Sequence, residues 1–463
     1  MKSKVTTLVI IDALLAIAAL FSAAVARFGY PEASQMLSDP ATIYIVATFL
    51  VIILFSSHLM EVYDRNKNLT KRAITINIAF GTITSFSLLS VVHYLLPHLV
   101  SGRGALFLSL CFFALLQICW HSLFLAGKSH YRFSQKILVL GTGVLAAQIG
   151  KMISSKAQNF TLVGYATCDS GLNKDNQKPA QLSVSQDMIL GNCDSLLDIA
   201  QRVQAEVIVV ALSERRGVFP LKDVLTCKLN SIQVMDAPSF YEIVEGKLLL
   251  ESITPGWFIF SSGFRRTTLL SISKRAIDIM LACAGLLVTL PFFPFIAIAI
   301  KLDSKGPVFF RQERVGDKEK PFILYKFRTM GQDAEKGTGA VWAEKNDPRI
   351  TKLGRFFRGS RIDEIPQLIN VLKGEMSFIG PRPERPEFVK KLKQIIPYYS
   401  KRHFIKPGLT GWAQVRYPYG SSVEDAVEKL RYDLYYIKNI SPFLDTLIFF
   451  ETIKVVLFGF GGR

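Results

Sequence analysis

The hydrophobic residues of this chain gather in five long runs separated by polar segments. Each of the first four is close to the roughly 20 residues that a helix needs to cross the hydrocarbon core of a bilayer. They predict four transmembrane helices, over Val5 to Ala26, Ile43 to Met60, Ala73 to Leu96 and Ala105 to Leu125. Asp12 lies inside the first run, where an acid is a candidate functional group. Its place near the start of the run favours a simpler interpretation, in which the carboxylate reaches water.

Positive charges lie on one side of these predicted helices. Lys and Arg are concentrated before the first run, between the second and third, and after the fourth, whereas the other two loops hold only Arg27 and Arg103. Cytoplasmic loops of membrane proteins are enriched in Lys and Arg. We therefore expect the N-terminus and everything after residue 127 in the cytoplasm.

From residue 135 the pattern changes to short apolar strands alternating with helix-like segments. Strands are expected in KILVLGTG, FTLVGYATCD and AEVIVVAL, and the first of them runs into the turn Gly141-Thr142-Gly143 and a helix. This order is typical of a Rossmann-like βαβ opening. The glycine turn either lines the pyrophosphate of a nucleotide or serves packing alone. Packing is favoured, because no nicotinamide-handling cluster follows.

The fifth apolar run, residues 276–300, carries Pro291 and Pro294 beyond its middle. Proline removes a helical hydrogen bond and clashes with the preceding turn, so a sharp bend is expected. A run that crossed the bilayer would leave the basic residues after it, such as Lys305 and Arg311, on the outer side. We therefore predict a re-entrant helix that breaks at Pro291 and returns to the cytoplasmic side.

Composition supports a membrane protein that meets anions. The chain has 463 residues, a net charge of +18 and 50% hydrophobic residues. A nucleic-acid binder would carry the charge without long apolar runs, so nucleic acid is not an expected partner; anionic headgroups and phosphorylated substrates are. The six cysteines and six histidines show no C-x-x-C or H-x-x-x-H spacing. Neither a zinc site nor a disulfide framework is indicated.

These patterns predict an α/β membrane protein in four parts. One part, the connector at residues 238–270, contains Gly256-Trp257-Phe258 and Arg265-Arg266. These indicate either contact with the bilayer surface or a packed interdomain loop. The last apolar stretch, residues 443–460, has charges spaced as in an interfacial amphipathic helix. The parts are a four-helix transmembrane bundle (1–127), a Rossmann-like α/β domain (128–237), a connector (238–270) and a mostly α catalytic domain with the re-entrant helix (271–463).

The stretch from Gly354 to Arg385 sets two adjacent carboxylates, Asp363 and Glu364, among arginines. Arginine forks bind phosphate oxygens, while an acid attacks or carries a divalent metal, so the pattern indicates chemistry on phosphates. A compatible and simpler interpretation is a helix cap, with Ser360 as N-cap, and on spacing alone capping is favoured because S-x-x-[DE] is common. The arginines are Arg355, Arg358, Arg361, Arg382 and Arg385.

Three ordered motifs occupy the C-terminal part: KFRTM, then GSRIDEIPQLINVLKGEMSFIGPRPERPEF, then KPGLTGWAQV. Together with the apolar run before them they resemble the bacterial sugar transferase family, the monotopic phosphoglycosyl transferases, over about residues 270–463. By architecture the whole chain is similar to the large membrane subgroup that starts exopolysaccharide and O-antigen synthesis. The resemblance implies transfer of a hexose-1-phosphate from a UDP-hexose to polyprenyl (undecaprenyl) phosphate, with release of UMP. It also implies the bacterial inner membrane and a cytoplasmic catalytic domain.

The resemblance also implies roles for individual residues. Asp363 would be the nucleophile, forming an acyl phosphosugar intermediate, and Glu364 would help to hold Mg²⁺. Covalent catalysis of this kind lets the soluble donor leave before the lipid acceptor reacts, so ping-pong kinetics are expected. The expected substrate- and phosphate-binding residues are Arg358, Arg382, Lys326, Arg328, Lys406 and Gln414.

Some of these expected binding residues also have simpler structural interpretations. Arg382 could pair with surface acids Glu384 and Glu387, Lys326 and Arg328 could pair with Asp363, and Trp412 could belong to the core. The leading alternative for the whole protein is a non-catalytic membrane scaffold of polysaccharide assembly. A nucleotide-sugar oxidoreductase would need a Tyr-x-x-x-Lys pair, and residues 135–235 contain none. The sequence names no sugar, and a homodimer through the membrane helices and middle domain is consistent with it.

Overall fold

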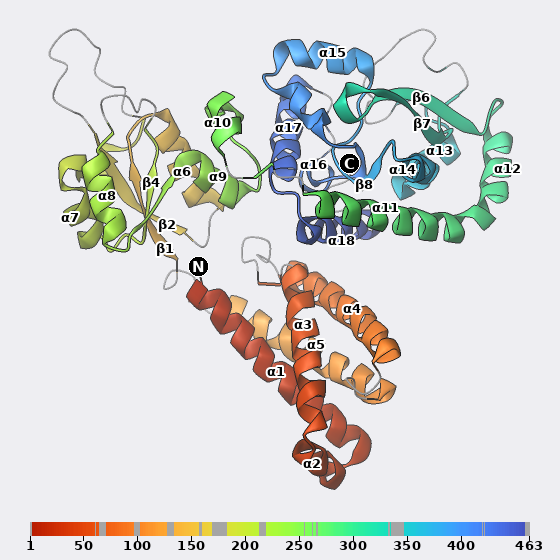
Figure 1. Cartoon of the computed structure of the whole chain (residues 1–463), viewed down its shortest axis with the longest axis horizontal. Coiled ribbons are helices and arrows are strands. Elements are labelled where there is room, and N and C mark those ends of the chain that lie inside the picture. Colours follow the sequence, from red (N-terminus) through yellow and green to blue (C-terminus); the bar gives the residue numbers. More distant parts are fainter. Residues whose placement is uncertain are drawn as a thin grey trace. The chain divides into compact units, whose positions relative to one another are not determined.

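The structure is a computed structural model in which the chain forms two compact units, Met1–Phe240 and Tyr241–Arg463. Each unit is described by itself (Figure 1). The structure describes residues 2–60, 62–63, 71–96, 102–126, 134–156, 160–168, 183–212, 219–253, 255–261, 263–264, 267–331, 334, 347–418, 420 and 422–458.

The first unit begins with long apolar helices, as predicted. Four of them are long and apolar enough to cross a membrane, within Thr6–Phe28, Ala41–Leu59, Ile74–Leu95 and Arg103–Phe124. α1 packs on α3 and α5, and α4 packs on the same two helices. Many apolar side chains point outward, which suits lipid rather than water. The helices are α1 (Lys2–Phe28), α2 (Tyr30–Ser38), α3 (Ala41–Leu59), α4 (Lys71–Leu95) and α5 (Arg103–Ala126).

Asp12 does not reach water, so the expectation for this residue is wrong. Its side chain is fully buried between helices. Gln117 Nε2 donates to Asp12 Oδ2 at 2.6 Å, and His121 Nε2 lies 3.2 Å from Oδ1. Gln117 Nε2 also reaches the Ser57 hydroxyl at 3.3 Å. A buried acid needs such partners, and α5 supplies both of them, while Ser57 of α3 holds Gln117.

The rest of the first unit is built on a parallel five-stranded sheet with the order β3-β2-β1-β4-β5. β1 and β4 lie centrally and are almost wholly buried, in keeping with their apolar sequences. The elements are β1 (Gln135–Leu140), α6 (Val144–Lys156), β2 (Phe160–Thr167), η2 (Gln186–Met188), β3 (Ile189–Asn192), η3 (Cys193–Ser195), α7 (Leu196–Arg202), β4 (Val207–Val210), α8 (Leu221–Leu229) and β5 (Gln233–Asp236). The three predicted strands are confirmed.

The turn after β1 is closely packed. Gly141 has a φ of +125°, and a Cβ placed there would lie 2.7 Å from the carbonyl oxygen of Ala211. Only glycine fits this contact between the ends of β1 and β4. Packing alone therefore accounts for the first glycine of the turn.

The second unit begins with the connector, which packs against α17 (Val423–Lys438). Trp257 lies among Phe258, Phe264 and the ammonium of Lys438, which is 5.0 Å from its ring centroid. Of the two interpretations, the structure supports a packed loop for this tryptophan; Arg265 and Arg266 lie outside the described residues. The connector elements are α9 (Ala237–Glu245), η4 (Leu250–Ser252) and α10 (Pro255–Phe260).

The fifth apolar run is a helix, a break and a second helix, as predicted. α11 (Thr268–Thr289) ends in the 3₁₀ turn η5 (Leu290–Phe292), and α12 (Phe293–Asp303) follows. Figure 1 shows α12 leaving α11 at a steep angle. The break falls at Pro291, which has no N–H for the α-helical ladder. Together these helices form a long apolar segment whose side chains are mostly exposed.

α11 is anchored at its polar positions. Asp278 is buried and accepts hydrogen bonds from Ser377 Oγ and from the backbone N–H of Phe378. Arg275 donates to the carbonyls of Val371 and Leu372 in the last turn of α14 (Gln367–Lys373), as cations at helix C-termini do. The half of this apolar segment before Pro291 is thus tied to α14 and to the strand at Ser377 and Phe378.

The remaining elements surround a core that includes Leu430, Leu434, Tyr436 and Ile448. β6 and β7 form an antiparallel hairpin, and β8 and β9 pair in parallel. They are β6 (Phe309–Val315), η6 (Asp317–Glu319), β7 (Pro321–Phe327), α13 (Lys352–Ser360), η7 (Ile362–Glu364), β8 (Ser377–Ile379), α15 (Pro386–Ile395), η8 (Tyr399–Phe404), β9 (Gly408–Thr410), α16 (Trp412–Arg416) and α18 (Pro442–Phe458).

The charges of α18 face the protein, unlike those of the predicted interfacial helix. Asp445 pairs with Lys274 Nζ at 2.7 Å, and Tyr436 donates to it at 2.6 Å. Lys454 is buried and bonds Glu451 at 3.0 Å. α18 is therefore held to its unit by its polar residues as well as by its apolar ones.

Candidate active site

The acid pair lies in a tight turn between two helices. α13 ends at Ser360, Arg361 takes the left-handed conformation with φ 56°, and Asp363 and Glu364 follow in η7. Ser360 Oγ donates to the carbonyl of Phe356, one turn back in α13. No side-chain cap bond is made at the start of η7 or of α14. The capping interpretation with Ser360 is therefore wrong, because Ser360 belongs to the end of the preceding helix.

Cations engage the two carboxylates unequally. Glu364 Oε1 accepts from Lys326 Nζ and from Arg382 Nη2, both at 2.9 Å, and Oε2 lies 3.4 Å from Arg361 Nη1. Asp363 has one longer ion pair, 3.8 Å from Lys326 Nζ. Both acids are buried, with 6% and 7% of their surfaces exposed. Asp363 is thus the acid with the freer oxygens.

The surroundings move the pKa values of the two acids in opposite directions. Burial raises the pKa of Asp363, and the charge of Glu364 adds to this, while Lys326 opposes it. Burial also disfavours the charged form of Glu364, but Lys326, Arg382 and Arg361 outweigh it and hold its pKa well below the usual range. Adjacent acids with divergent pKa values are typical of a site that gives them different tasks.

Arg382 reaches the pair from the turn Gly380-Pro381-Arg382-Pro383. Its Nη1 donates to Gln414 Oε1 at 3.2 Å, while its Nη2 is on Glu364. The turn is fixed by its backbone, because Gly380 N–H donates to Thr410 O and Gly408 N–H to Pro381 O, each at 2.9 Å. Of the two surface acids considered for Arg382, Glu387 pairs with Arg385 at 3.5 Å and Glu384 lies 3.8 Å from Arg314.

Three other predicted binding residues, Arg358, Arg328 and Lys406, lie in different places. Arg358 Nε donates to Thr329 Oγ1 at 3.0 Å beside the acid pair, and Arg328 donates to the carbonyl of Ser304 at 2.7 Å, not to Asp363. Lys406 does not line the pocket that holds the acids; its ammonium lies near Gly374, at the end of α14.

The same segment holds Trp412, which belongs to the core. It is 4% exposed, and its Nε1 donates to the carbonyl of Gly246 in the connector. Gln414, two residues on in α16, does line the pocket. Its Nε2 is buried and finds no hydrogen-bond partner among the described residues, so this donor is available to a ligand.

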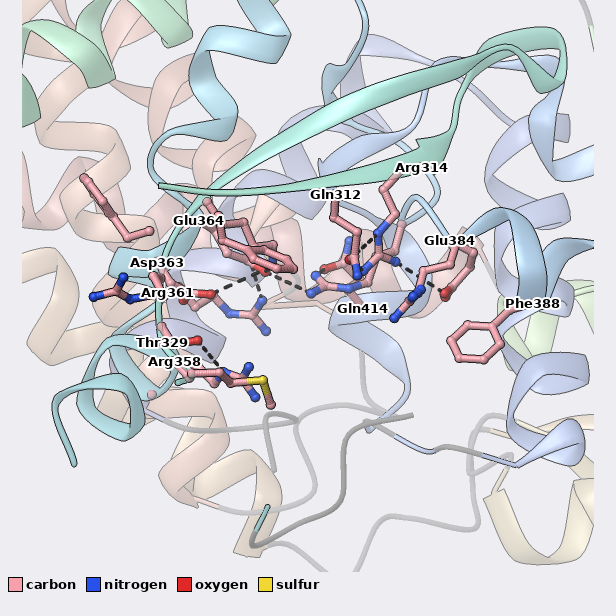
Figure 2. Close-up of a pocket in the computed structure, with 18 of the residues that line it drawn as sticks. Gln312, Arg314, Thr329, Arg358, Arg361, Asp363, Glu364, Glu384, Phe388 and Gln414 are labelled. Atoms are coloured by element: carbon pink, nitrogen blue, oxygen red, sulfur yellow. Dashed lines mark hydrogen bonds and ion pairs between the residues drawn. The ribbon is translucent and has the colours of Figure 1, made fainter. Parts of the chain in front are cut away.

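The acid pair opens into a pocket of about 510 Å³, the size of a small-molecule site. Figure 2 shows Asp363, Glu364, Arg358 and Thr329 toward one end and Arg314, Glu384 and Phe388 toward the other. A pocket lined by cations at both ends and by hydrogen-bonding groups along its length suits a phosphorylated polar substrate.

Sequence reasoning missed the far end of this pocket. Arg402 and Asp433 are both nearly fully buried and form an ion pair at 2.8 Å, although 30 residues separate them and no motif links them. Gln312 and Arg314 also line it. Their spacing along β6 puts them on one face of a strand, and this was the signal available for finding them.

Among the described residues no group of three or more His, Cys, Asp and Glu side chains is placed to hold a metal by itself. The adjacent Asp363 and Glu364 still fit Mg²⁺, which proteins often bind through one or two carboxylates plus substrate phosphates and water. Since both Glu364 oxygens already meet cations, the substrate would have to supply most of the ligands.

A buried acid pair inside an arginine-lined pocket defines an enzyme-like site for phosphate chemistry, and comparison with known proteins gives its family. The bacterial sugar transferase family matches residues 269–459, which include every residue of the pocket. The chain belongs to this family.

Three relatives illustrate the match. A protein of Aeromonas hydrophila named UDP-N-acetylgalactosamine-undecaprenyl-phosphate N-acetylgalactosaminephosphotransferase is 40% identical over 51% of this chain and 55% of its own length. The undecaprenyl-phosphate glucose phosphotransferase of Komagataeibacter xylinus is 33% identical over 71% of this chain and 60% of its own length. The UDP-glucose:undecaprenyl-phosphate glucose-1-phosphate transferase of Escherichia coli (strain K12) is 34% identical over 69% of this chain and 67% of its own. The matches to the first two thus span only 55% and 60% of those relatives.

Proposed function

We propose that this protein transfers a sugar-1-phosphate from a UDP-sugar to undecaprenyl phosphate, as a membrane step of polysaccharide synthesis. The observation that carries the proposal is the buried Asp363-Glu364 pair, set among Lys326, Arg361 and Arg382 in the region that matches the family. The relatives' names contain undecaprenyl phosphate together with glucose or N-acetylgalactosamine. We therefore take a UDP-hexose as donor and leave the choice of hexose to experiment.

Asp363 is the proposed nucleophile. One of its carboxylate oxygens attacks the phosphorus that carries the sugar, the bond from that phosphorus to the UMP oxygen breaks, and UMP leaves with the electron pair. An oxygen of the acceptor phosphate then attacks the same phosphorus, and the Asp363 carboxylate leaves unchanged. Asp363 suits this task better than Glu364, because its nearest cation is at 3.8 Å whereas Glu364 is held at 2.9 Å by two.

The cations make such an attack feasible. A carboxylate approaching a phosphodiester meets negative oxygens, and preorganised cations reduce that repulsion in the transition state. Arg382 and Lys326 are already aimed at the acid pair, and the unpartnered Nε2 of Gln414 adds a neutral donor beside Arg382. Arg358 lies on the other side, on Thr329.

We further propose that the site uses Mg²⁺, held by Glu364 with help from substrate phosphates. When bound, the ion would neutralise phosphate oxygens of the donor. The protein's own part is to keep Glu364 ionised, which Lys326, Arg382 and Arg361 do by lowering its pKa. A Glu364 carboxylate that stays charged at neutral pH can serve a cation whenever the substrate brings one.

The membrane arrangement forms the remaining part of the proposal. Four helices of the first unit would span a bacterial inner membrane as a bundle, and residues 276–300 would enter the cytoplasmic leaflet, bend at Pro291 and return. The parallel sheet would be a Rossmann-like domain in the cytoplasm. The bend between α11 and α12 and their exposed apolar side chains support the re-entrant arrangement.

The test is a UMP-release assay in detergent with undecaprenyl phosphate and a panel of UDP-sugars. We expect turnover by the wild type with at least one donor and none above background by Asp363→Asn. Glu387→Gln is the matched control, because it makes the same type of change at a side chain that is 56% exposed and outside the pocket. If no UDP-sugar supports UMP release by folded wild-type protein, the scaffold alternative becomes the better account.

A further inference from the structure

One buried arginine of the pocket is not explained by the chemistry at the acid pair. Arg328 follows β7 directly and is 6% exposed. Its Nη2 donates to the carbonyl of Ser304 at 2.7 Å and lies 3.1 Å from the Ser304 hydroxyl. Ser304 ends α12, so this nitrogen acts as a C-terminal cap of that helix.

Capping uses only part of the guanidinium. Arg328 Nε and Nη1 are both buried, and neither has a hydrogen-bond partner among the described residues. An unpaired N–H in the interior is costly, and one on a charged group is more so. Because Arg328 lines the pocket that holds Asp363, these two nitrogens are where an anion would be bound.

The surroundings of Arg328 differ from those of Arg382. The N–H of Arg328 donates to Val308 O at 2.9 Å, which places it beside the start of β6. Pro307, Phe309 and Phe310 there are exposed and line the pocket at this point. The capped helix α12 is apolar and exposed at Phe295, Ile298 and Leu302. The anion site therefore adjoins an apolar surface, whereas Arg382 adjoins Gln414 and Glu364.

We propose that Arg328 binds the phosphate of the lipid acceptor, in a subsite separate from the donor phosphates. A phosphate carried on a polyprenyl chain must reach the pocket with its chain on apolar surface, and the side of the pocket at α12 and Phe309 offers that surface. Thr329 lies next to Arg328 and accepts a hydrogen bond from Arg358 at 3.0 Å, which brings a second cation toward the same place. The inference rests on the proposed two-step transfer and adds to it which residue serves the second step.

The experiment separates the two half-reactions in the full-length protein. Donor alone, as UDP-glucose or UDP-N-acetylgalactosamine, gives a burst of UMP from the first half-reaction; addition of undecaprenyl phosphate then reports the second. For Arg328→Gln we expect a normal UMP burst and an acceptor KM raised about tenfold or more, since a charge-assisted contact to phosphate is lost. Arg328→Lys keeps a cation and should recover part of the affinity. Arg311→Gln is the control, because it removes the same charge from β6 outside the pocket.

Each result bears on one proposal. If the wild type gives no burst, the two-step transfer itself is wrong. If Arg328→Gln reduces the UMP burst as much as it reduces the acceptor half-reaction, Arg328 serves donor binding or the fold. The proposed acceptor subsite is then wrong. If acceptor KM is unchanged while inhibition by phosphatidylglycerol micelles disappears, Arg328 binds lipid headgroups and the inference is also wrong.

Discussion

Asp12 and Asp363 are both buried, and their hydrogen-bond and ion-pair partners differ. Asp12 is enclosed by apolar helices and is met by the neutral amide of Gln117 at 2.6 Å and by His121 at 3.2 Å. Asp363 is buried to nearly the same extent, but its one ion pair is 3.8 Å long and it lies beside another acid among cations. Burial alone therefore does not mark a reactive acid. What marks Asp363 is burial with its oxygens left largely unengaged.

The largest effect is expected when Asp363 loses its nucleophilic oxygen. Asp363→Asn should lower kcat for UMP release by about 10³-fold or more, since an amide is a poor nucleophile. Glu364→Gln should also be impaired, but it should still form some phosphosugar adduct, because Asp363 remains. Steady-state assays and adduct detection on both variants measure this. A Glu364 variant without adduct beside an Asp363 variant that retains it would reverse the assignment.

The second largest loss of activity is expected when Arg382, in the Gly380-Pro381-Arg382-Pro383 turn, is replaced. Arg382→Ala is expected to lower kcat/KM by about 10²-fold, as removal of one transition-state donor does. Arg382→Lys should recover little, because one ammonium cannot hold both Glu364 and Gln414. Arg311→Ala, on β6 and outside the pocket, is the comparison, and equal losses in the two alanine variants would contradict a specific role for Arg382.

The pH dependence should reveal the raised pKa of Asp363. The attacking form is the carboxylate, so the donor half-reaction should be fast above this pKa and fall as the pH drops through it. Burial and Glu364 raise the pKa of Asp363. The acid limb of the pH–rate profile should therefore lie above the pH at which an ordinary aspartate titrates. Lys326→Met should move the limb to higher pH, since the Lys326 charge favours the ionised form. A limb that stays in place or moves to lower pH would contradict the assignment of this limb to Asp363.

The smallest catalytic effect is expected at the other aspartate. Asp12→Asn can set an NH₂ group against the Gln117 Nε2 donor, so we expect a stability loss of about 1–2 kcal/mol from a mismatched buried hydrogen bond. The kcat/KM of the folded protein should stay close to wild type. Thermal unfolding in detergent and the UMP assay measure the two. A variant of wild-type stability that has lost its activity would give Asp12 a functional role.

Much of this could be predicted from local patterns. The long apolar helices, the three strands and the helix break at Pro291 follow from hydrophobic periodicity and proline chemistry, which act within a few residues. Asp363 and Glu364 are neighbours in the sequence, and Lys326 and Arg382 lie in motifs, so their grouping could be expected.

The failures share one physical cause. Ser360 fitted an N-cap by spacing, but Arg361 ends α13 in a left-handed conformation, and the hydroxyl then serves the helix behind it. The sequence places Asp12 in water, yet Gln117 and His121, its partners in α5, lie more than 100 residues away in sequence. The Arg402–Asp433 pair had no local signal at all. Tertiary contacts decided each of these, and a single sequence does not state them.

The central claim is that Asp363 carries the sugar phosphate between the two substrates. Its most direct test is intact-mass spectrometry of the full-length protein after mixing with UDP-sugar and Mg²⁺ but without acceptor. The account predicts a mass increase equal to one sugar phosphate on the wild type, reversed by undecaprenyl phosphate and absent from Asp363→Asn. An adduct of the same mass on Asp363→Asn, or UMP release by wild type only when acceptor is present, would contradict it.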